Sequence, residues 1–212
     1  MKLTIEDEKR LICDAIQNQV IEYNEYPYIY SCIIFGFYDD NGKRLSVSDM
    51  RKFWDKYEVA KTCKFIYNNL KESLGISQIY SFIEHHSPLL DGDGEFIAEG
   101  RFHINLITTD IMDRTIEEPD RKVRRLMQDN NGFGIPIMNM VGDLDAIKLQ
   151  LFDASVRKCE WVNRYRYSVK TQYLDTKEDV ERTVQYCLKD YMKNKVDFSD
   201  IIVSKASDFY KP

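Results

Sequence analysis

Two strand-like segments separated by a run of turn-forming residues place the tightest constraint on how this chain can fold. Residues 79–86 are rich in aromatic and β-branched side chains, and residues 101–109 alternate in polarity. The intervening run contains Pro88, Gly92 and Gly94, which are typical of turns. The pattern predicts a hairpin of two antiparallel strands.

This predicted hairpin carries all three histidines of the chain. Side chains alternate faces along a strand, so His103 and Asn105 share one face, and Glu84 and His86 share one face of the partner strand. An imidazole, an amide oxygen and a carboxylate on neighbouring strands can converge on one divalent cation, and oxygen-rich ligation favours Mn²⁺ or Mg²⁺ over Zn²⁺. The alternative is that His85 and His86 are partly exposed polar residues at a strand end.

Composition limits the class of protein. The 212 residues are 43% hydrophobic and 31% charged, which is typical of a soluble globular chain. No apolar run is long enough to span a membrane and the acidic start lacks the apolar region of a signal peptide, so we expect a cytoplasmic protein with no membrane partner. The five cysteines are scattered and odd in number, which predicts free thiols.

Charge is unevenly distributed along the chain. The net charge of −5 argues against a general nucleic-acid coat protein. Residues 1–100 carry 11 basic and 17 acidic side chains, for −6, whereas residues 101–195 carry 17 and 15, for +2. A small basic groove on an acidic body is compatible with these numbers.

Hydrophobic periodicity predicts an α+β fold, in which a largely antiparallel sheet is backed by helices. We expect a helical extension over residues 1–25, one domain over residues 26–196 and a C-terminal tail over residues 197–212. The apolar strand 28–38 should lie centrally in the sheet. The other expected elements are helices 5–23, 49–74, 118–128, 143–156 and 176–194, a loop at 130–142, a strand at 161–174 and an edge strand at 201–204.

The predicted strand 161–174 has an unusual alternation of basic and aromatic residues. Arg164, Arg166 and Lys170 fall on one face, and two tyrosines fall on the other. Such interleaving suits a groove that follows a phosphate backbone and stacks unpaired bases. A half-buried strand with a solvated basic face explains the same pattern equally well.

The last predicted helix pairs a phenol with an ammonium group. Tyr186 and Lys189 are three residues apart and therefore neighbours on the helix surface, and Lys193 extends the same stripe. A tyrosine nucleophile must lose a proton whose reference pKa is about 10, which a nearby cation assists. Attack on a phosphodiester also needs the phosphate charge neutralised, and a bound divalent cation does this. The two predicted halves of a site are thus chemically complementary.

The order of these motifs resembles the HUH endonuclease superfamily, and in particular the rolling-circle replication initiators, or Rep proteins. The phrase EGRFHINLIT is similar to the family's histidine motif, Gly-x-Pro-His-hydrophobic-His, and YCLKD is similar to its Tyr-x-x-Lys motif. The resemblance covers residues 28–194 and implies an RRM-like nuclease fold. It departs at Phe102, which replaces the usual proline, and at Asn105, which replaces the second histidine.

The resemblance implies a role for each matching residue. His103, Asn105 and Glu84 would be metal ligands, with His86 or, less favourably, Glu99 making up for the missing histidine. Tyr186 would be the nucleophile, and Lys189 would orient DNA or stabilise charge. Tyr191 is the alternative nucleophile, but it lies about 140° around the helix from Tyr186. The DNA-binding set would comprise Arg101, Arg164, Arg166, Lys170 and Lys193.

The implied activity is metal-dependent nicking and rejoining of single-stranded or hairpin origin DNA through a covalent 5′-phosphotyrosine. A plasmid, phage or mobile element would use it for rolling-circle replication, with helicase and polymerase supplied by the host. The alternatives are a relaxase or transposase of the same superfamily, an origin-binding protein without nuclease activity, and a structural α+β protein whose motifs are coincidental.

Overall fold

The fold is described here from a computed structural model of the chain. The described residues are 4–22, 27–34, 56–85, 89–90, 93, 96–98, 102–129, 143–159, 169–193 and 201–203. Parts of the predicted strands 28–38 and 161–174, the start of the predicted helix 49–74 and the predicted loop 130–142 lie outside them.

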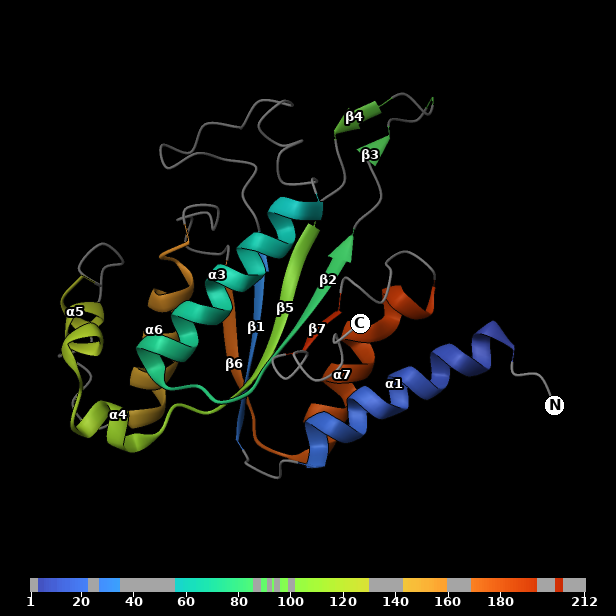
Figure 1. Cartoon of the computed structure of the whole chain (residues 1–212). Coiled ribbons are helices and arrows are strands. Elements are labelled where there is room, and N and C mark those ends of the chain that lie inside the picture. The colour runs from blue at the N-terminus through green and yellow to red at the C-terminus, as the bar shows by residue number, and fades with distance from the viewer. Residues whose placement is uncertain are drawn as a thin grey trace.

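A five-stranded antiparallel sheet forms the centre of the described structure (Figure 1). Its strand order is β6-β1-β5-β2-β7, so β5 is central and β1 is also paired on both sides, as its apolar sequence predicts. The strands are β1 (Tyr28–Ile34), β2 (Ile79–His85), β5 (Phe102–Thr109), β6 (Val169–Leu174) and β7 (Ile201–Val203). The α+β class, the β2–β5 hairpin and the edge strand near residue 201 are therefore confirmed.

Helices cover both faces of this sheet (Figure 1). One face packs against α3 and α6, with α4 and α5 beyond them, and the other packs against α7, which in turn contacts α1. The helices are α1 (Ile5–Glu22), α3 (Lys56–Leu74), α4 (Asp113–Glu117), α5 (Arg121–Asp129), α6 (Leu144–Val156) and α7 (Lys177–Met192). Within the described part of the chain, no helix combines the length and apolar character needed to cross a membrane.

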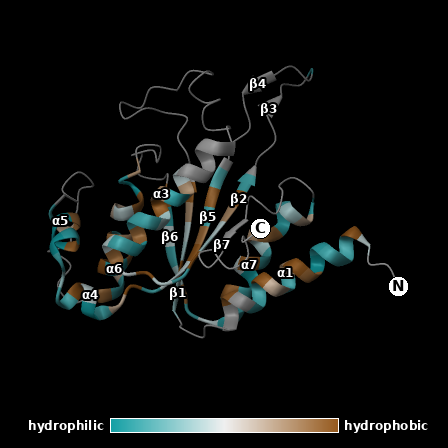
Figure 2. Ribbon diagram, viewed as in Figure 1, coloured by the Kyte–Doolittle hydropathy of each residue, from teal (hydrophilic) through white to brown (hydrophobic). Residues whose placement is uncertain are grey.

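Strand alternation creates two separate cores. On β1, Ile29 and Ile33 pack toward α3, whereas Tyr28 packs toward α7. On β5, Ile104 joins the first core and Ile107 the second. Figure 2 shows hydrophobic residues concentrated in the strands and along parts of the helices beside them, and α5 as largely hydrophilic. The polar site described below interrupts the second core, on the α7 face.

Capping side chains and one glycine fix several helix ends. The Thr176 side chain accepts a hydrogen bond from the Asp179 backbone N–H (3.1 Å) at the start of α7, and Thr4 caps α1 in the same way through Asp7 (3.2 Å). Helix α3 stops at Gly75, whose φ of 68° is the left-handed conformation that glycine adopts most readily.

One helix begins later than predicted, and two small elements were not predicted. The first of these is the short helix α4. The helix expected at 118–128 is present as α5, which begins only at Arg121 because Pro119 has no N–H to donate and disfavours helix at the preceding residue. Asp120 then caps α5 by accepting hydrogen bonds from the N–H groups of Lys122 and Val123. The turn between β2 and β5 also contains a small extra hairpin, β3 (Leu89–Leu90) with β4 (Phe96–Ala98).

A buried ammonium group joins α6 to the end of β5. Lys148 is 5% exposed, and its Nζ lies 2.6 Å from carboxylate oxygens of both Asp110 and Asp113. Burial disfavours the charged form, but the two carboxylates outweigh it and raise the pKa of Lys148.

We therefore expect Lys148→Met to lower the free energy of unfolding by about 3 kcal/mol, because it leaves the partly buried Asp110 without its cation. The control is Lys122→Met, which removes an exposed ion pair to Glu72 and should cost less than about 0.5 kcal/mol. Urea unfolding of both variants measures the difference. Equal costs would contradict a structural role for the buried pair.

Candidate active site

Strand pairing brings the predicted metal ligands together. Glu84 on β2 lies directly opposite His103 on β5, and Asn105 follows two residues later on the same face. All three side chains are buried, with exposed fractions of 4% for Glu84, 8% for His103 and 0% for Asn105. The shared face predicted from alternation is therefore observed, and it is the face that α7 covers.

Hydrogen bonds connect these side chains into a network. His103 Nε2 lies 2.8 Å from Glu84 Oε2, and Asn105 Nδ2 donates to the same oxygen over 3.3 Å. The Tyr30 hydroxyl, from β1, donates to Asn105 Oδ1 over 2.8 Å. Three adjacent strands thus contribute four side chains, one each from β1 and β2 and two from β5.

Helix α7 adds the phenol and the ammonium group. Lys189 Nζ lies 2.5 Å from Glu84 Oε1 and 3.4 Å from the centroid of the Tyr186 ring, a cation–π contact. Tyr186 is 47% exposed, unlike the buried ligand set. The structure therefore brings Glu84, His103 and Asn105 together with Tyr186 and Lys189, which lie about 80 residues or more away in sequence.

The buried carboxylate is held in its ionised form. Burial alone would raise the pKa of Glu84, but hydrogen bonds and charge from Lys189, His103 and Asn105 outweigh burial and lower it. Burial likewise opposes the charged form of Lys189, yet Glu84 and Tyr186 raise its pKa. Both shifts favour the ion pair, so Glu84 is anionic and Lys189 cationic at neutral pH.

The ion pair makes stability depend on pH in a defined direction. Because the pKa of Glu84 is lowered on folding, its contribution is complete above the ordinary glutamate pKa and is lost as the pH falls through the folded value. We expect Lys189→Met to cost about 2 kcal/mol at pH 7. This cost should shrink steadily below about pH 4.5. Urea unfolding from pH 7 to pH 2.5 tests this, and a cost independent of pH would contradict it.

Two thiols lie next to the site without offering a competing nucleophile. Burial raises the pKa of Cys32 to about 11 and also raises that of Cys187, with Glu84 adding to both shifts. Both thiols therefore stay protonated at neutral pH and do not act as thiolates. Burial similarly raises the pKa of Tyr30, so its hydroxyl remains a donor to Asn105.

The ligand set fits a hard divalent cation if two groups move. Glu84 and His103 provide a carboxylate and an imidazole, and rotation of the Asn105 amide would turn its oxygen toward Glu84, leaving its nitrogen to donate to the Tyr30 hydroxyl. Lys189 would have to leave Glu84 Oε1, which it occupies as an internal cation. Among the described residues, no group of three or more His, Cys, Asp or Glu side chains could hold a metal ion, so a metal site there depends on the Asn105 amide.

Tyr30 and Tyr28 offer a matched test of the network. Each donates one hydroxyl hydrogen bond from the same face of β1, Tyr30 to Asn105 and Tyr28 to the Val20 carbonyl oxygen (2.7 Å). We expect both Tyr→Phe substitutions to cost about 1 kcal/mol of unfolding free energy. Only Tyr30→Phe should also weaken Mn²⁺ binding, by about 10-fold, because the rotated Asn105 amide would lose the hydroxyl that accepts from its nitrogen and holds its oxygen toward the metal. If calorimetry gives equal Mn²⁺ affinities for both variants, Tyr30 does not contribute to metal binding.

The remaining predicted residues divide into two groups. Lys170 is exposed on β6, opposite Cys32 in the ladder, and therefore on the sheet face of the site, and Lys193 is exposed just after α7. The predicted residues that lie outside the described part of the chain are His86, Glu99, Arg101, Arg164 and Arg166. Tyr191, the alternative predicted nucleophile, is buried, with Lys9 Nζ 4.6 Å from its ring centroid, whereas Tyr186 is exposed.

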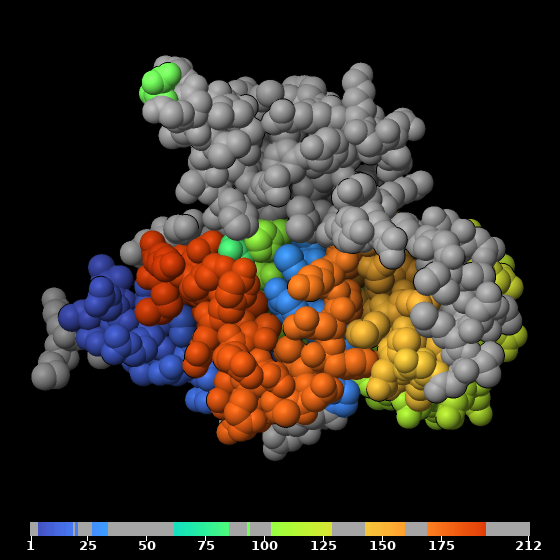
Figure 3. All heavy atoms as spheres, turned by 180° about the vertical axis from the view of Figure 1, so that it is seen from behind, coloured from blue at the N-terminus to red at the C-terminus, as the bar shows by residue number. Residues whose placement is uncertain are grey.

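Sequence reasoning missed Tyr30, which it treated as part of an apolar strand. The available signal was alternation, because Tyr28, Tyr30 and Cys32 share one face of β1 and Cys32 pairs with Asn105. It also missed the direct contact between Lys189 and Glu84, which depends on how α7 lies across the sheet. Figure 3 shows the side of the molecule on which α7 covers the sheet, with light-blue atoms of β1 and green atoms of β5 visible beside the orange-red atoms of α7.

Comparisons with protein-family models, curated proteins and solved structures find no match. What defines the site is therefore its own chemistry: a buried carboxylate, imidazole and amide beneath an exposed phenol and an ammonium group.

Proposed function

We propose that this chain is a divalent-metal-dependent tyrosine endonuclease that nicks and rejoins single-stranded DNA, in the manner of rolling-circle replication initiators of the HUH superfamily. The observation that carries the proposal is the convergence of Tyr186 and Lys189 on the buried Glu84, His103 and Asn105. Strands β2 and β5 and helix α7, which are far apart in the sequence, supply these groups.

Glu84, His103 and Asn105 would hold Mn²⁺ or Mg²⁺. When bound, the cation would neutralise charge on the scissile phosphate. The Tyr186 oxygen would attack phosphorus, forming a phosphotyrosine bond while the bond to the 3′ oxygen breaks. The phenolic proton would leave to solvent or a base, and the departing 3′ oxygen would acquire a proton. Reversal by that hydroxyl would rejoin the strand, so no ATP is consumed.

Lys189 is suited to two successive contacts. It holds Glu84 in the charged form and lies against the Tyr186 ring. An ammonium released from Glu84 by an incoming cation would stay beside Tyr186 and could donate to a phosphate oxygen. Lys170 and Lys193 would contact the DNA backbone, together with Arg101, Arg164 and Arg166.

A second function is favoured by one specific observation. Lys189 and His103 already occupy both oxygens of Glu84, an arrangement that is self-sufficient as a buried ion-pair network. An origin-binding protein without nuclease activity would preserve such a network for stability alone. Metal uptake separates the two functions, because only the nuclease requires it.

Incubation with a pool of end-labelled single-stranded oligonucleotides tests the proposal. We expect nicks that require Mn²⁺ and disappear with EDTA, together with recombinant products when a second strand end is supplied. DNA binding without nicking, and without metal uptake, would favour the origin-binding function. The sequence at the nick would show whether a replication origin, a transfer origin or a transposon end is the substrate.

A further inference from the structure

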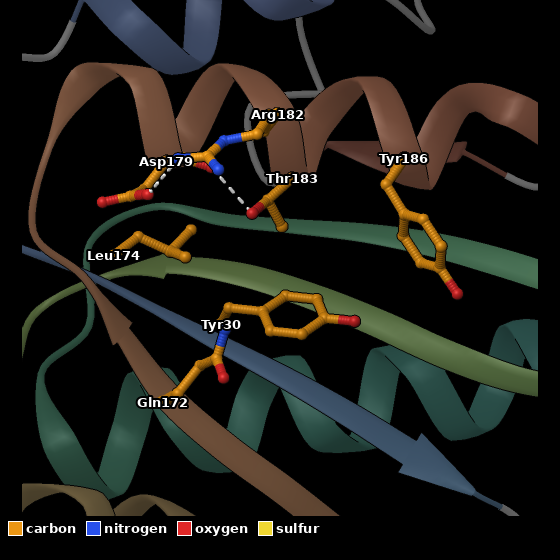
Figure 4. Close-up of a pocket in the computed structure, with 7 residues that line it drawn as sticks. All are labelled: Tyr30, Gln172, Leu174, Asp179, Arg182, Thr183 and Tyr186. Carbon is orange, nitrogen blue, oxygen red and sulfur yellow. Dashed lines mark hydrogen bonds and ion pairs between the residues drawn. The ribbon is translucent and has the colours of Figure 1, made fainter.

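A pocket of about 380 Å³ lies beside Tyr186, between β6 and α7. Figure 4 shows the side chains that line it, with the Tyr186 and Tyr30 rings at the same end and their hydroxyl groups directed the same way. Leu174 contributes apolar surface, Gln172 a carboxamide from β6, and Arg182 and Thr183 polar groups from α7. None of the proposed metal ligands Glu84, His103 and Asn105 lines this pocket.

The pocket is continuous with the candidate active site through two side chains. Tyr30 lines the pocket with its ring, and its hydroxyl donates to Asn105 in the ligand network. Tyr186 lines the same pocket and contacts Lys189 with the face of its ring. A group bound in the pocket therefore lies next to the proposed nucleophile.

The charges at the pocket favour a neutral ring over a phosphate. Arg182 Nη2 lies 2.7 Å from Asp179 Oδ1, so its charge is already paired. The lining residues carry this one acid and this one base. Two phenol rings and a leucine offer stacking and apolar contact, and base–aromatic stacking is the common means of holding unpaired bases. The volume is at the small end of the range of about 300–1,000 Å³ for ligand pockets, which suits one nucleoside and not a stacked pair.

Gln172 adds a group able to read a base. Its side chain is exposed, and its carboxamide offers two donors and one acceptor. Glutamine can pair with a base edge through a donor and its acceptor at the same time. The surrounding rings supply contact that every base can make, so discrimination would come from this amide.

We propose that this pocket binds the unpaired base of one nucleotide adjacent to the scissile phosphate, and that Gln172 determines which base is preferred there. The inference rests on the proposed nicking function and adds a specificity-determining residue to it. The base would stack against Tyr30 or Tyr186 while its edge faces Gln172, and the sugar–phosphate would continue toward Tyr186.

The experiment compares wild type with Gln172→Leu, which keeps the size of the side chain and removes its hydrogen bonds. Gln128→Leu, an exposed glutamine on α5, is the matched control. Nicked oligonucleotides from a pool randomised at every position are sequenced. We expect one position beside the nick to show a base preference that falls at least about 5-fold in Gln172→Leu only, or about 1 kcal/mol. Unchanged preferences would overturn the base pocket while leaving the nuclease in place.

Binding in EDTA provides a second readout that does not depend on cleavage. Fluorescence anisotropy with oligo-dA, -dC, -dG and -dT compares the same three proteins. If wild type does not nick, the nuclease proposal fails on its own, and discrimination that depends on Gln172 in this assay would still support a base pocket. Equal affinities of wild type and Gln172→Leu for all four oligonucleotides would overturn it.

Discussion

Tyr186→Phe is expected to abolish the covalent protein–DNA adduct and to lower nicking at least about 1,000-fold, which corresponds to about 4 kcal/mol of transition-state stabilisation. The substitution removes the single oxygen that would attack phosphorus. Tyr186 is 47% exposed, and phenylalanine keeps the ring on which Lys189 rests, so unfolding free energy should change by less than about 0.5 kcal/mol. Denaturing gels and urea unfolding measure the two quantities.

The control for this prediction is Tyr191→Phe, on the same helix. Tyr191 is buried and away from the ligand network, so its variant should form adducts at the wild-type rate. If adducts survive in Tyr186→Phe and disappear in Tyr191→Phe, the nucleophile is Tyr191 and the prediction for Tyr186 is wrong.

Glu84→Gln and Lys189→Met are expected to change Mn²⁺ affinity in opposite directions. Glu84→Gln removes the one carboxylate of the ligand set and should weaken binding at least about 100-fold. Lys189→Met removes the cation that lies 2.5 Å from Glu84 Oε1. A metal ion would then have no ammonium to displace, and affinity should rise about 10-fold, or 1.4 kcal/mol. Both variants should nick poorly. Glu84→Gln binds the metal weakly, and Lys189→Met lacks the ammonium group beside Tyr186.

Titration calorimetry with MnCl₂ at pH 7 measures these affinities. Lys177→Met is the control, since it removes the same charge from the start of α7, where Lys177 pairs with Glu181 at the surface (3.6 Å). Its affinity should match wild type. Weaker Mn²⁺ binding by Lys189→Met would contradict an internal cation at the metal position and would indicate that Lys189 supports the ligands instead.

Much of the site was predictable because strands are periodic. The face shared by His103 and Asn105 follows from alternation, and the hairpin places Glu84 beside them once its two strands pair. Tyr186 and Lys189 share a helix face by the same kind of rule. These predictions use only the spacing of residues within one element or within two neighbouring strands.

Contacts between distant elements were not predictable in this way. The bond from Tyr30 to Asn105 requires β1 to pair with β5, and the contact from Lys189 to Glu84 depends on how α7 crosses the sheet. The pocket at Gln172 likewise forms only where β6 meets α7. Such geometry is set by packing between elements over the whole domain. The spacing of residues within one element carries no information about that packing.

The most direct test of the central claim is mass spectrometry of a covalent adduct. Wild-type protein is incubated with single-stranded oligonucleotides and Mn²⁺, digested with trypsin and nuclease, and searched for a modified tyrosine. We expect a nucleotide joined through its 5′ phosphate to Tyr186, formed only with the metal present. A modified residue other than Tyr186, or no adduct under conditions in which Mn²⁺ is bound, would contradict it.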